Sequence, residues 1–296
     1  MSGKQRSVLA HLFWSSRPIS WINTAFPFAA TYVYLTHRVD LTLVVGTLFF
    51  LVPYNLAMYG INDVFDYESD LRNPRKGGIE GELLPPRMHR ITLIASAVAC
   101  LPFLIYLYLV GGAGSNPMAT NGMLTFAMFT VVAYSAKGLR FKEKPVLDSF
   151  TSASHFVNPM LYAVVLTGHW FDEPVLLQSW LAFVCWGAAS HAFGAVQDVR
   201  ADREAGIGSI ATALGARLTT RLAFAAYALA GLLMLSAGWP AGLAAVAAAP
   251  YLAILAPHLN ITDETCETAN RGWRRFIWLN YFAGFVITML LIVSSI

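Results

Sequence analysis

Acidic side chains recur at four-residue intervals in two stretches of this sequence. The first stretch, "NDVFDYESD", contains Asn62, Asp63, Asp66 and Asp70. The second stretch, "QDVRAD", contains Asp198 and Asp202. Side chains three or four positions apart are neighbours on a helix, so each set forms one stripe if its helix continues through the motif. Like charges in such a stripe repel each other, and a bound cation would relieve the repulsion.

Hard oxygen donors without His or Cys favour magnesium, which takes one or two carboxylates and completes its shell with water and substrate phosphate. Basic residues follow both motifs and could bind the remaining phosphate oxygens; they are Arg72, Arg75, Lys76 and Arg203. We therefore predict a Mg²⁺–diphosphate site. The expected metal ligands are Asn62, Asp63, Asp66, Asp70, Asp198 and Asp202, and the catalytic residues among them are Asp66, Asp70, Asp198 and Asp202.

The plainer interpretation is that these acids are solvated loop residues beside compensating bases. It would serve for one motif, but it leaves the repetition of the acid spacing and the trailing arginines unexplained. The sequence contains neither the spacing of an EF-hand nor a Walker A or GxGxxG stretch, which argues against a calcium loop and a nucleotide site. A nucleic-acid partner is not expected.

The composition indicates that a membrane positions these motifs. Of 296 residues, 56% are hydrophobic and only 12% are charged, whereas soluble domains carry about a quarter charged residues. Apolar runs of about 20 residues, the length that spans a bilayer, repeat along the chain. We predict a single-domain, all-α polytopic membrane protein. Its nine expected helices are residues 19–36, 42–60, 91–110, 121–136, 150–168, 176–196, 219–237, 240–257 and 275–295.

The charges predict which side of the membrane each loop faces. All Lys and Arg residues except Arg38 lie in or beside the N-terminal segment and alternate loops, which the positive-inside rule places in the cytoplasm. Residues 1–18 read as an interfacial segment without a cleavable signal peptide. Residues 61–90 and 197–218 read as cytoplasmic motif loops. We expect the N-terminus and the active site on the cytoplasmic side of the cell membrane.

Several polar residues lie inside the expected spans, where burial is costly and often functional, and we single out two asparagines and two histidines. They are Asn23, His155, Asn158 and His191. His155 and His191 are candidates for a proton acceptor or a polar contact in a cavity, and ordinary packing is the alternative for each. Asp148 is expected to cap the helix that follows it.

The motifs resemble those of the UbiA superfamily of intramembrane prenyltransferases. "NDVFDYESD" matches the family's NxxxDxxxD, and Gln197, Asp198, Asp202 and Gly206 match its second acidic motif. A third block, "YSAKGLRFKEKPVLDS", matches at Tyr134, Lys137, Arg140 and Lys142. The resemblance implies nine helices around a central cavity with cytoplasmic cap loops over the metal site. It also implies a set of diphosphate contacts, namely Arg17, Arg72, Lys76, Tyr134, Lys137, Arg140 and Arg203.

Within the superfamily, "YGINDVFDYESDLRNPRKGGIEGELL" is most similar to the lycopene elongases, which build C50 carotenoids. This similarity implies Mg²⁺-dependent transfer from an allylic diphosphate, such as dimethylallyl diphosphate, to lycopene within the lipid. An aromatic or quinone precursor and a lipid are the alternative acceptors. A cation-coupled transporter is the rival from another class, although transporter sites usually lie near the bilayer midplane. The oligomeric state is not predicted.

Overall fold

The computed structural model describes residues 6–71, 82–170 and 174–294, and the regular structure in these ranges is helical. The N-terminal half contains α1 (Val8–Ser15), η1 (Pro18–Ser20), α2 (Ile22–Thr36), α3 (Leu41–Leu51), α4 (Pro53–Phe65), α5 (Tyr67–Asp70), α6 (Pro86–Gly112), α7 (Pro117–Ser135) and η2 (Phe141–Glu143). The remainder contains α8 (Leu147–Leu166), α9 (Pro174–Val196), α10 (Val199–Ala205), α11 (Ile210–Leu214), α12 (Ala216–Leu235), η3 (Ala241–Ala247), α13 (Ala248–Leu255), η4 (Ala256–His258), η5 (Asp263–Ala269) and α14 (Asn270–Ser294).

Six segments of the described chain are long and apolar enough to cross a membrane. They are Leu41–Phe65, Pro86–Gly112, Pro174–Val196, Ala216–Leu235, Ala241–His258 and Asp263–Ser294. Helices α2, α7 and α8 occupy the other three expected ranges but do not belong to this set. Helix α2 has only 15 residues, and α8 carries several Ser and Thr residues and a His. The count of nine spans therefore stays a prediction.

Pro53 interrupts the helix within the span Leu41–Phe65. Pro53 begins α4, where its missing N–H is tolerated, and it separates α4 from α3. The amide nitrogen of Asn55 donates to the carbonyl oxygens of Phe50 (2.8 Å) and Leu51 (3.1 Å) beside the break. Because an unpaired backbone group is costly in an apolar surrounding, this buried amide stabilises the interruption.

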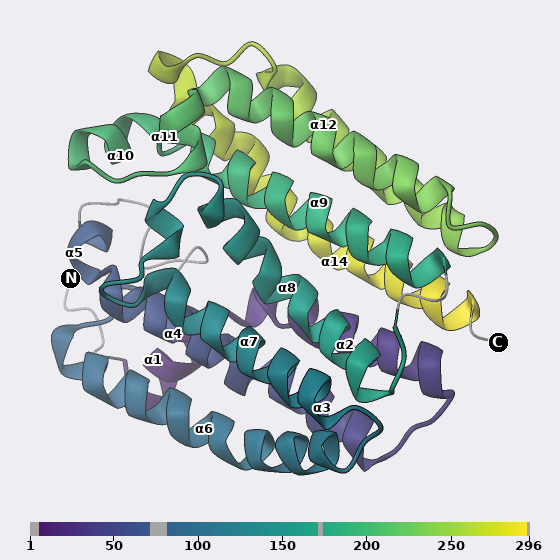
Figure 1. Cartoon of the computed structure of the whole chain (residues 1–296). Helices are drawn as coiled ribbons and strands as arrows, with labels where there is room; N and C mark the ends of the chain where they lie inside the picture. The colour runs from purple at the N-terminus through teal and green to yellow at the C-terminus, as the bar shows by residue number, and fades with distance from the viewer. Residues whose placement is uncertain (1–5, 72–81, 171–173, 295–296) are drawn as a thin grey trace.

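The helices form two packed groups with α8 between them (Figure 1). One core joins Phe28, Phe50 and Tyr162 between α2, α3 and α8. The other joins Phe193, Tyr227, Tyr251 and Phe276 between α9, α12, α13 and α14. Helix α8 contacts α9 on one side and α2 and α7 on the other, so it connects the two cores.

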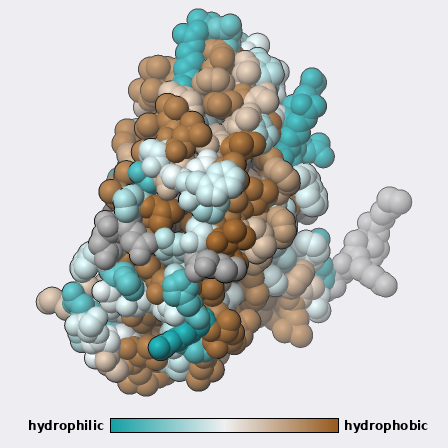
Figure 2. Space-filling model, turned by 90° about the vertical axis from the view of Figure 1, so that its right-hand side faces the viewer, coloured by the Kyte–Doolittle hydropathy of each residue, from teal (hydrophilic) through white to brown (hydrophobic). Residues whose placement is uncertain are grey.

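Apolar side chains also cover much of the outer surface, as expected of helices that face lipid. Exposed large side chains follow α6, where Leu109 is 70% exposed, and α14, where Trp278 is 64% exposed. Figure 2 views the molecule from the end opposite α5 and α10, and hydrophobic side chains reach the surface around much of its outline. The short helices α1, α5, α10 and α11 gather at the other end of the bundle (Figure 1). Both acidic motifs therefore lie at that same end.

Candidate active site

The first acidic motif lies where α4 ends. The helix stops at Phe65, and Asp66 separates it from α5, so the condition that one helix continues through Asp70 is not met at this residue. The helical spacing nevertheless persists, because the Asp66 N–H donates to the Asn62 carbonyl (2.9 Å) and the Asp70 N–H to the Asp66 carbonyl (2.8 Å). The Asn62 side-chain nitrogen donates to Asp66 Oδ2 (2.7 Å), which confirms that these two side chains are neighbours.

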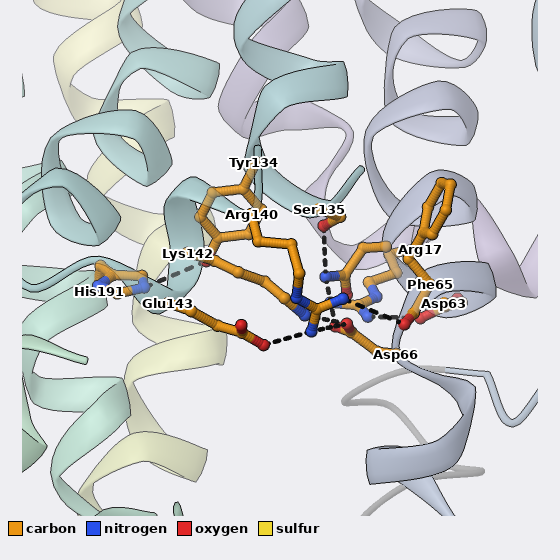
Figure 3. Close-up of polar contacts among 11 residues, drawn as sticks. Arg17, Asp63, Phe65, Asp66, Tyr134, Ser135, Arg140, Lys142, Glu143 and His191 are labelled. Carbon is orange, nitrogen blue, oxygen red and sulfur yellow. Dashed lines mark hydrogen bonds and ion pairs between the residues drawn. The ribbon is translucent and has the colours of Figure 1, made fainter. Parts of the chain in front are cut away.

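Basic side chains from the segment after α7 converge on Asp66. The ammonium group of Lys142 contacts Asp66 Oδ1, and Nη2 of Arg140 lies 3.6 Å from the same oxygen (Figure 3). Arg140 also pairs with Glu143, and its hydrogen bond lowers the pKa of the Glu143 carboxyl below its ordinary value. Arg140 has a φ of 43°, an uncommon conformation for a side-chain-bearing residue that is often found at functional sites.

The N-terminal segment is fastened to the same motif through Asp63. This carboxylate is buried, and its two oxygens accept hydrogen bonds from Arg17 Nη2 and Ser15 Oγ, both at 2.9 Å. Arg17 also has a positive φ of 48°, and its guanidinium lies over the ring of Tyr59, 4.2 Å from the centroid. Arg17 thus lies beside the predicted metal site. Asp63 accepts hydrogen bonds from Arg17 and Ser15, and its ion pair with Arg17 fixes the position of that guanidinium.

Several expected diphosphate contacts cannot be placed beside Asp66. Arg72 and Lys76, together with Arg75, lie outside the described residues. Lys137 is exposed in the turn that follows α7. The guanidinium of Arg203 pairs with Asp263 and donates to the Thr212 carbonyl (2.9 Å). The roles of these residues toward a diphosphate stay predictions.

The second acidic motif begins directly after α9. The Asp202 N–H donates to the Asp198 carbonyl (2.8 Å), so these two residues also have helical spacing. The side chain of Gln197 donates to the Gly194 carbonyl (2.9 Å) and accepts a hydrogen bond from Asn270 of α14 (2.7 Å). The start of α14 therefore fixes the chain at the point where it enters this motif.

Polar contacts of Ser135, Tyr134 and His191 lead from the first motif toward the segment that follows the second one. Asn62 donates to Ser135 Oγ (3.0 Å), and the adjacent Tyr134 hydroxyl lies 3.1 Å from His191 Nε2. His191 Nδ1 lies 3.1 Å from Ser149 Oγ and 4.0 Å from Asp148 Oδ2.

Asp148 is not the cap of α8, whose N-cap is Val146. Its Oδ2 instead accepts the backbone N–H of Ile210 (2.7 Å), the first residue of α11. The expected helix-capping role is therefore wrong for α8, and the residue instead joins α8 to α11. Its burial, with 0% of the residue exposed, is a tertiary property that the sequence does not disclose.

The chemistry of the donors fits magnesium. The first motif offers carboxylates and an amide, and the second offers two carboxylates. In the described part of the chain, no three His, Cys, Asp or Glu side chains lie close enough to hold a metal by themselves. Mg²⁺ does not require such a cage, because it commonly binds one or two carboxylates and retains water or substrate phosphate. Of the six expected ligands, Asn62, Asp66, Asp70, Asp198 and Asp202 would hold it. Asp63 is left out of the set because its two oxygens accept hydrogen bonds from Arg17 and Ser15.

Sequence reasoning did not assign a role to Lys142, although this residue lies nearer to Asp66 than Arg140 does. Its position in the "GLRFKEKP" block was the available signal. Glu82 was also missed: this buried residue binds Arg6 and His11 and thereby attaches α1 to the start of α6.

Apolar outer faces and helices that are long and apolar enough to cross a membrane indicate an integral membrane protein, with a cluster of acidic and basic side chains at one end. The sequence model of the UbiA prenyltransferase family matches residues 24–280. The chain belongs to this family and is therefore a prenyltransferase.

Two named relatives are similar to this chain over most of its length. The chain is 54% identical over 291 residues to the C(50) beta-cyclic carotenoids biosynthesis protein LbtBC of Dietzia sp., covering 97% of this chain and 65% of that protein. It is 50% identical over 281 residues to a lycopene elongase/hydratase of Corynebacterium glutamicum, covering 94% of this chain and 95% of the relative. The chain thus spans about two thirds of the first relative and nearly all of the second.

Solved structures share the fold. A UbiA homolog from Archaeoglobus fulgidus bound to GPP and Mg²⁺ gives a TM-score of 0.65 at 17% identity, with 94% of this chain and 99% of that chain covered. The same homolog bound to DMAPP and Mg²⁺ gives 0.63 at 17% identity, covering 95% and 99%. Identities this low establish the architecture alone.

Proposed function

We propose that this protein transfers the prenyl group of an allylic diphosphate, dimethylallyl diphosphate in the first instance, to lycopene in the synthesis of C50 carotenoids. The observation that carries the proposal is the 50% identity to the Corynebacterium glutamicum lycopene elongase/hydratase over nearly the whole of both chains. The convergence of Lys142 and Arg140 on Asp66 supports a site for a diphosphate at the end of the bundle.

The chain's own residues have distinct tasks in this proposal. Asn62, Asp66 and Asp70 on one side, and Asp198 and Asp202 on the other, hold Mg²⁺ against the diphosphate. When bound, the metal neutralises the diphosphate and makes it a better leaving group. Asp63 positions Arg17, whose guanidinium faces the first motif.

Basic side chains bind the diphosphate and stabilise the negative charge that develops as it leaves. We assign this task to Lys142 together with Arg17, Arg72, Lys76, Lys137, Arg140 and Arg203. Tyr134 is left out of the set because its hydroxyl faces His191. The separated allylic cation is then attacked by the terminal alkene of the acceptor, and the apolar helices keep bulk water away from it.

The proposal includes the arrangement in the membrane. Nine helices surround a central cavity that takes the polyene from the lipid, and the motif segments 61–90 and 197–218 cap its cytoplasmic mouth. The N-terminus lies in the cytoplasm, because the basic residues concentrate on that side.

Purified protein in detergent with dimethylallyl diphosphate, lycopene and Mg²⁺ tests this function. We expect new C45 and C50 pigments by chromatography, one diphosphate released for each prenyl group transferred, and no product when a chelator removes the metal. Diphosphate release without a larger pigment would overturn the choice of acceptor. Prenylation of a phenolic acid or a quinone precursor in place of lycopene would support a different member of the same family.

A further inference from the structure

Three polar side chains from three helices form a line beside the first acidic motif. Tyr134 of α7 lies 3.1 Å from His191 Nε2 of α9, and His191 Nδ1 faces Asp148 of α8, whose Oδ2 is 4.0 Å away. Figure 3 shows Tyr134 and His191 directed toward each other next to the cluster around Asp66. Neither His191 nor Asp148 has a task in binding or releasing the diphosphate as described above.

The buried carboxylate of Asp148 lies 4.0 Å from His191 Nδ1, too far for a hydrogen bond but close enough to act on the imidazole through its charge. Two backbone N–H groups, those of Ser149 and Ile210, donate to Asp148 at 2.7 Å each and compensate its buried charge. A carboxylate on the Nδ1 side favours the tautomer that carries its proton on Nδ1. The Nε2 lone pair then accepts the hydroxyl hydrogen of Tyr134, and the tautomer is assigned from these contacts.

This orientation suits the uptake of a proton. A proton that reaches the Tyr134 oxygen displaces the phenolic proton onto His191 Nε2. The imidazolium formed in this way lies against the negative charge of Asp148, as a buried charge requires. Ser149 Oγ, 3.1 Å from Nδ1, helps to fix the ring.

The contacts of Tyr134 and His191 begin beside the first acidic motif. Tyr134 is adjacent to Ser135, which accepts a hydrogen bond from Asn62 (3.0 Å), and Asn62 donates to Asp66 Oδ2 (2.7 Å). Tyr134 is therefore one residue along α7 from the side chain that contacts the first acidic motif.

We propose that Tyr134 and His191 are catalytic residues that take up the proton lost by the prenylated acceptor, and that Asp148 is a positioning residue for His191. The inference rests on the proposed function. When the acceptor alkene attacks the allylic carbon, the carbon–oxygen bond to the diphosphate breaks and its electron pair leaves with the diphosphate. The new carbon–carbon bond leaves a tertiary cation on the acceptor.

One proton must then be removed, whichever route quenches this cation. In direct deprotonation, a neighbouring C–H bond breaks, its electron pair becomes the new double bond, and Tyr134 accepts the proton as its own passes to His191. In hydration, water adds to the cation and the resulting oxonium loses its proton to the same acceptor. Imidazolium returns the proton to solvent or to the departing diphosphate before the next turnover.

The test compares diphosphate release with pigment formation in the same reactions, for wild type and for His191→Gln, Tyr134→Phe and Asp148→Asn. Because the relay acts after ionisation, we expect the first two variants to release diphosphate within about threefold of the wild-type rate. Their yield of elongated pigment per diphosphate released should fall at least about tenfold. This is less than the rate enhancement of about 100-fold or more that a positioned acid–base group typically contributes. Without proton uptake, the new carbon–carbon bond breaks again and its electron pair returns to the acceptor alkene. The regenerated allylic cation is captured by water, so the free prenyl alcohol should accumulate. Asp148→Asn should show the same uncoupling to a smaller degree.

Ser190→Ala is the matched control. Ser190 precedes His191 on α9, but its hydroxyl bonds Tyr227 (2.9 Å) on another side of the helix. This variant also removes a buried hydroxyl, and its pigment yield per diphosphate should equal that of wild type.

The proposal is overturned if the His191 and Tyr134 variants keep wild-type coupling, or if release and pigment formation fall in parallel, since a purely structural defect lowers both. Tyr134→Phe keeps the aromatic ring and carries the test if His191→Gln does not fold. A wild-type protein that makes no larger pigment refutes the proposed function itself, which separates the two failures.

Discussion

Charge balance around Asp66 decides what this end of the molecule can bind. The negative charges of Asp66 and Glu143 match the positive charges of Lys142 and Arg140, so these four side chains together are neutral. A bound Mg²⁺ would make the cluster cationic, as an anionic diphosphate requires. The contacts with Lys142 and Arg140 that occupy Asp66 in the structure would then be shared with the ligand.

Removing the charge of Asp66 should abolish turnover. Asp66→Asn keeps the size of the side chain but weakens it as a ligand for a hard cation. We expect the rate of pigment formation to fall by at least about 100-fold, since even residues that support metal ligands commonly cost 10–100-fold. Glu68→Gln makes the same chemical change at an exposed position of α5 and should keep wild-type activity. Equal activity of the two variants would refute the metal assignment.

The two lysines of "FKEKP" provide a second contrast. Lys142 contacts Asp66, whereas Lys144 is exposed and lies 5.0 Å from the ring of Phe141. Lys142→Met should raise the KM for the allylic diphosphate by about 10–100-fold, because a hydrogen bond to a charged group contributes about 1.5–3 kcal/mol. Lys144→Met should leave this KM within about twofold of wild type. Steady-state kinetics over a range of diphosphate concentrations measures both, and identical values would show that Lys142 does not bind the donor.

At the scale of elements, short helices hold the second motif in place. Helix α10 is tied to η5 by two ion pairs, Arg203 with Asp263 and Arg200 with Glu267. Asp263 also accepts the backbone N–H of Ala216 (2.7 Å) at the start of α12, so it joins three elements. The pair of Arg200 and Glu267 is more exposed, with 56% and 66% of the two side chains accessible.

This difference predicts unequal effects on stability. Asp263→Asn should lower the stability of the folded protein by about 1 kcal/mol, after allowance for solvent screening of a partly exposed pair. For a protein of this size that corresponds to a Tm lower by about 2–4 °C. Glu267→Gln should change stability by less than about 0.5 kcal/mol. Thermal unfolding in detergent measures both, and an equal loss in the two variants would contradict the role given to Asp263.

Local patterns predicted the elements well, and tertiary contacts account for what they missed. The "SAGWPAG" stretch marked the end of α12 at Leu235 and the start of η3 at Ala241, because a cluster of Gly and Pro favours a turn between helices. The four-residue acid spacing likewise predicted the contact of Asn62 with Asp66. By contrast, Asp148 binds a backbone group 62 positions away, and no local pattern discloses such a partner.

At the scale of the whole molecule, the basic residues predict one orientation in the membrane. In a cysteine-free background, Lys144→Cys should react only with membrane-permeant thiol reagents in intact cells, and Arg38→Cys should react with impermeant ones as well. Both positions are exposed in the structure. The positive-inside rule requires this asymmetry if the acidic motifs face the cytoplasm. The reverse pattern of labelling would invert the topology and place the site on the wrong side for a cytoplasmic diphosphate.

The central claim is that the two acidic motifs share one magnesium-bound diphosphate. The most direct test is an experimental structure with Mg²⁺ and a thiolodiphosphate analogue of dimethylallyl diphosphate, which cannot readily ionise. We predict metal density between one diphosphate and carboxylates of both motifs, Asp66 or Asp70 from the first and Asp198 or Asp202 from the second, with Lys142 on a phosphate oxygen. A diphosphate held by only one motif, with the other facing solvent, would contradict the account.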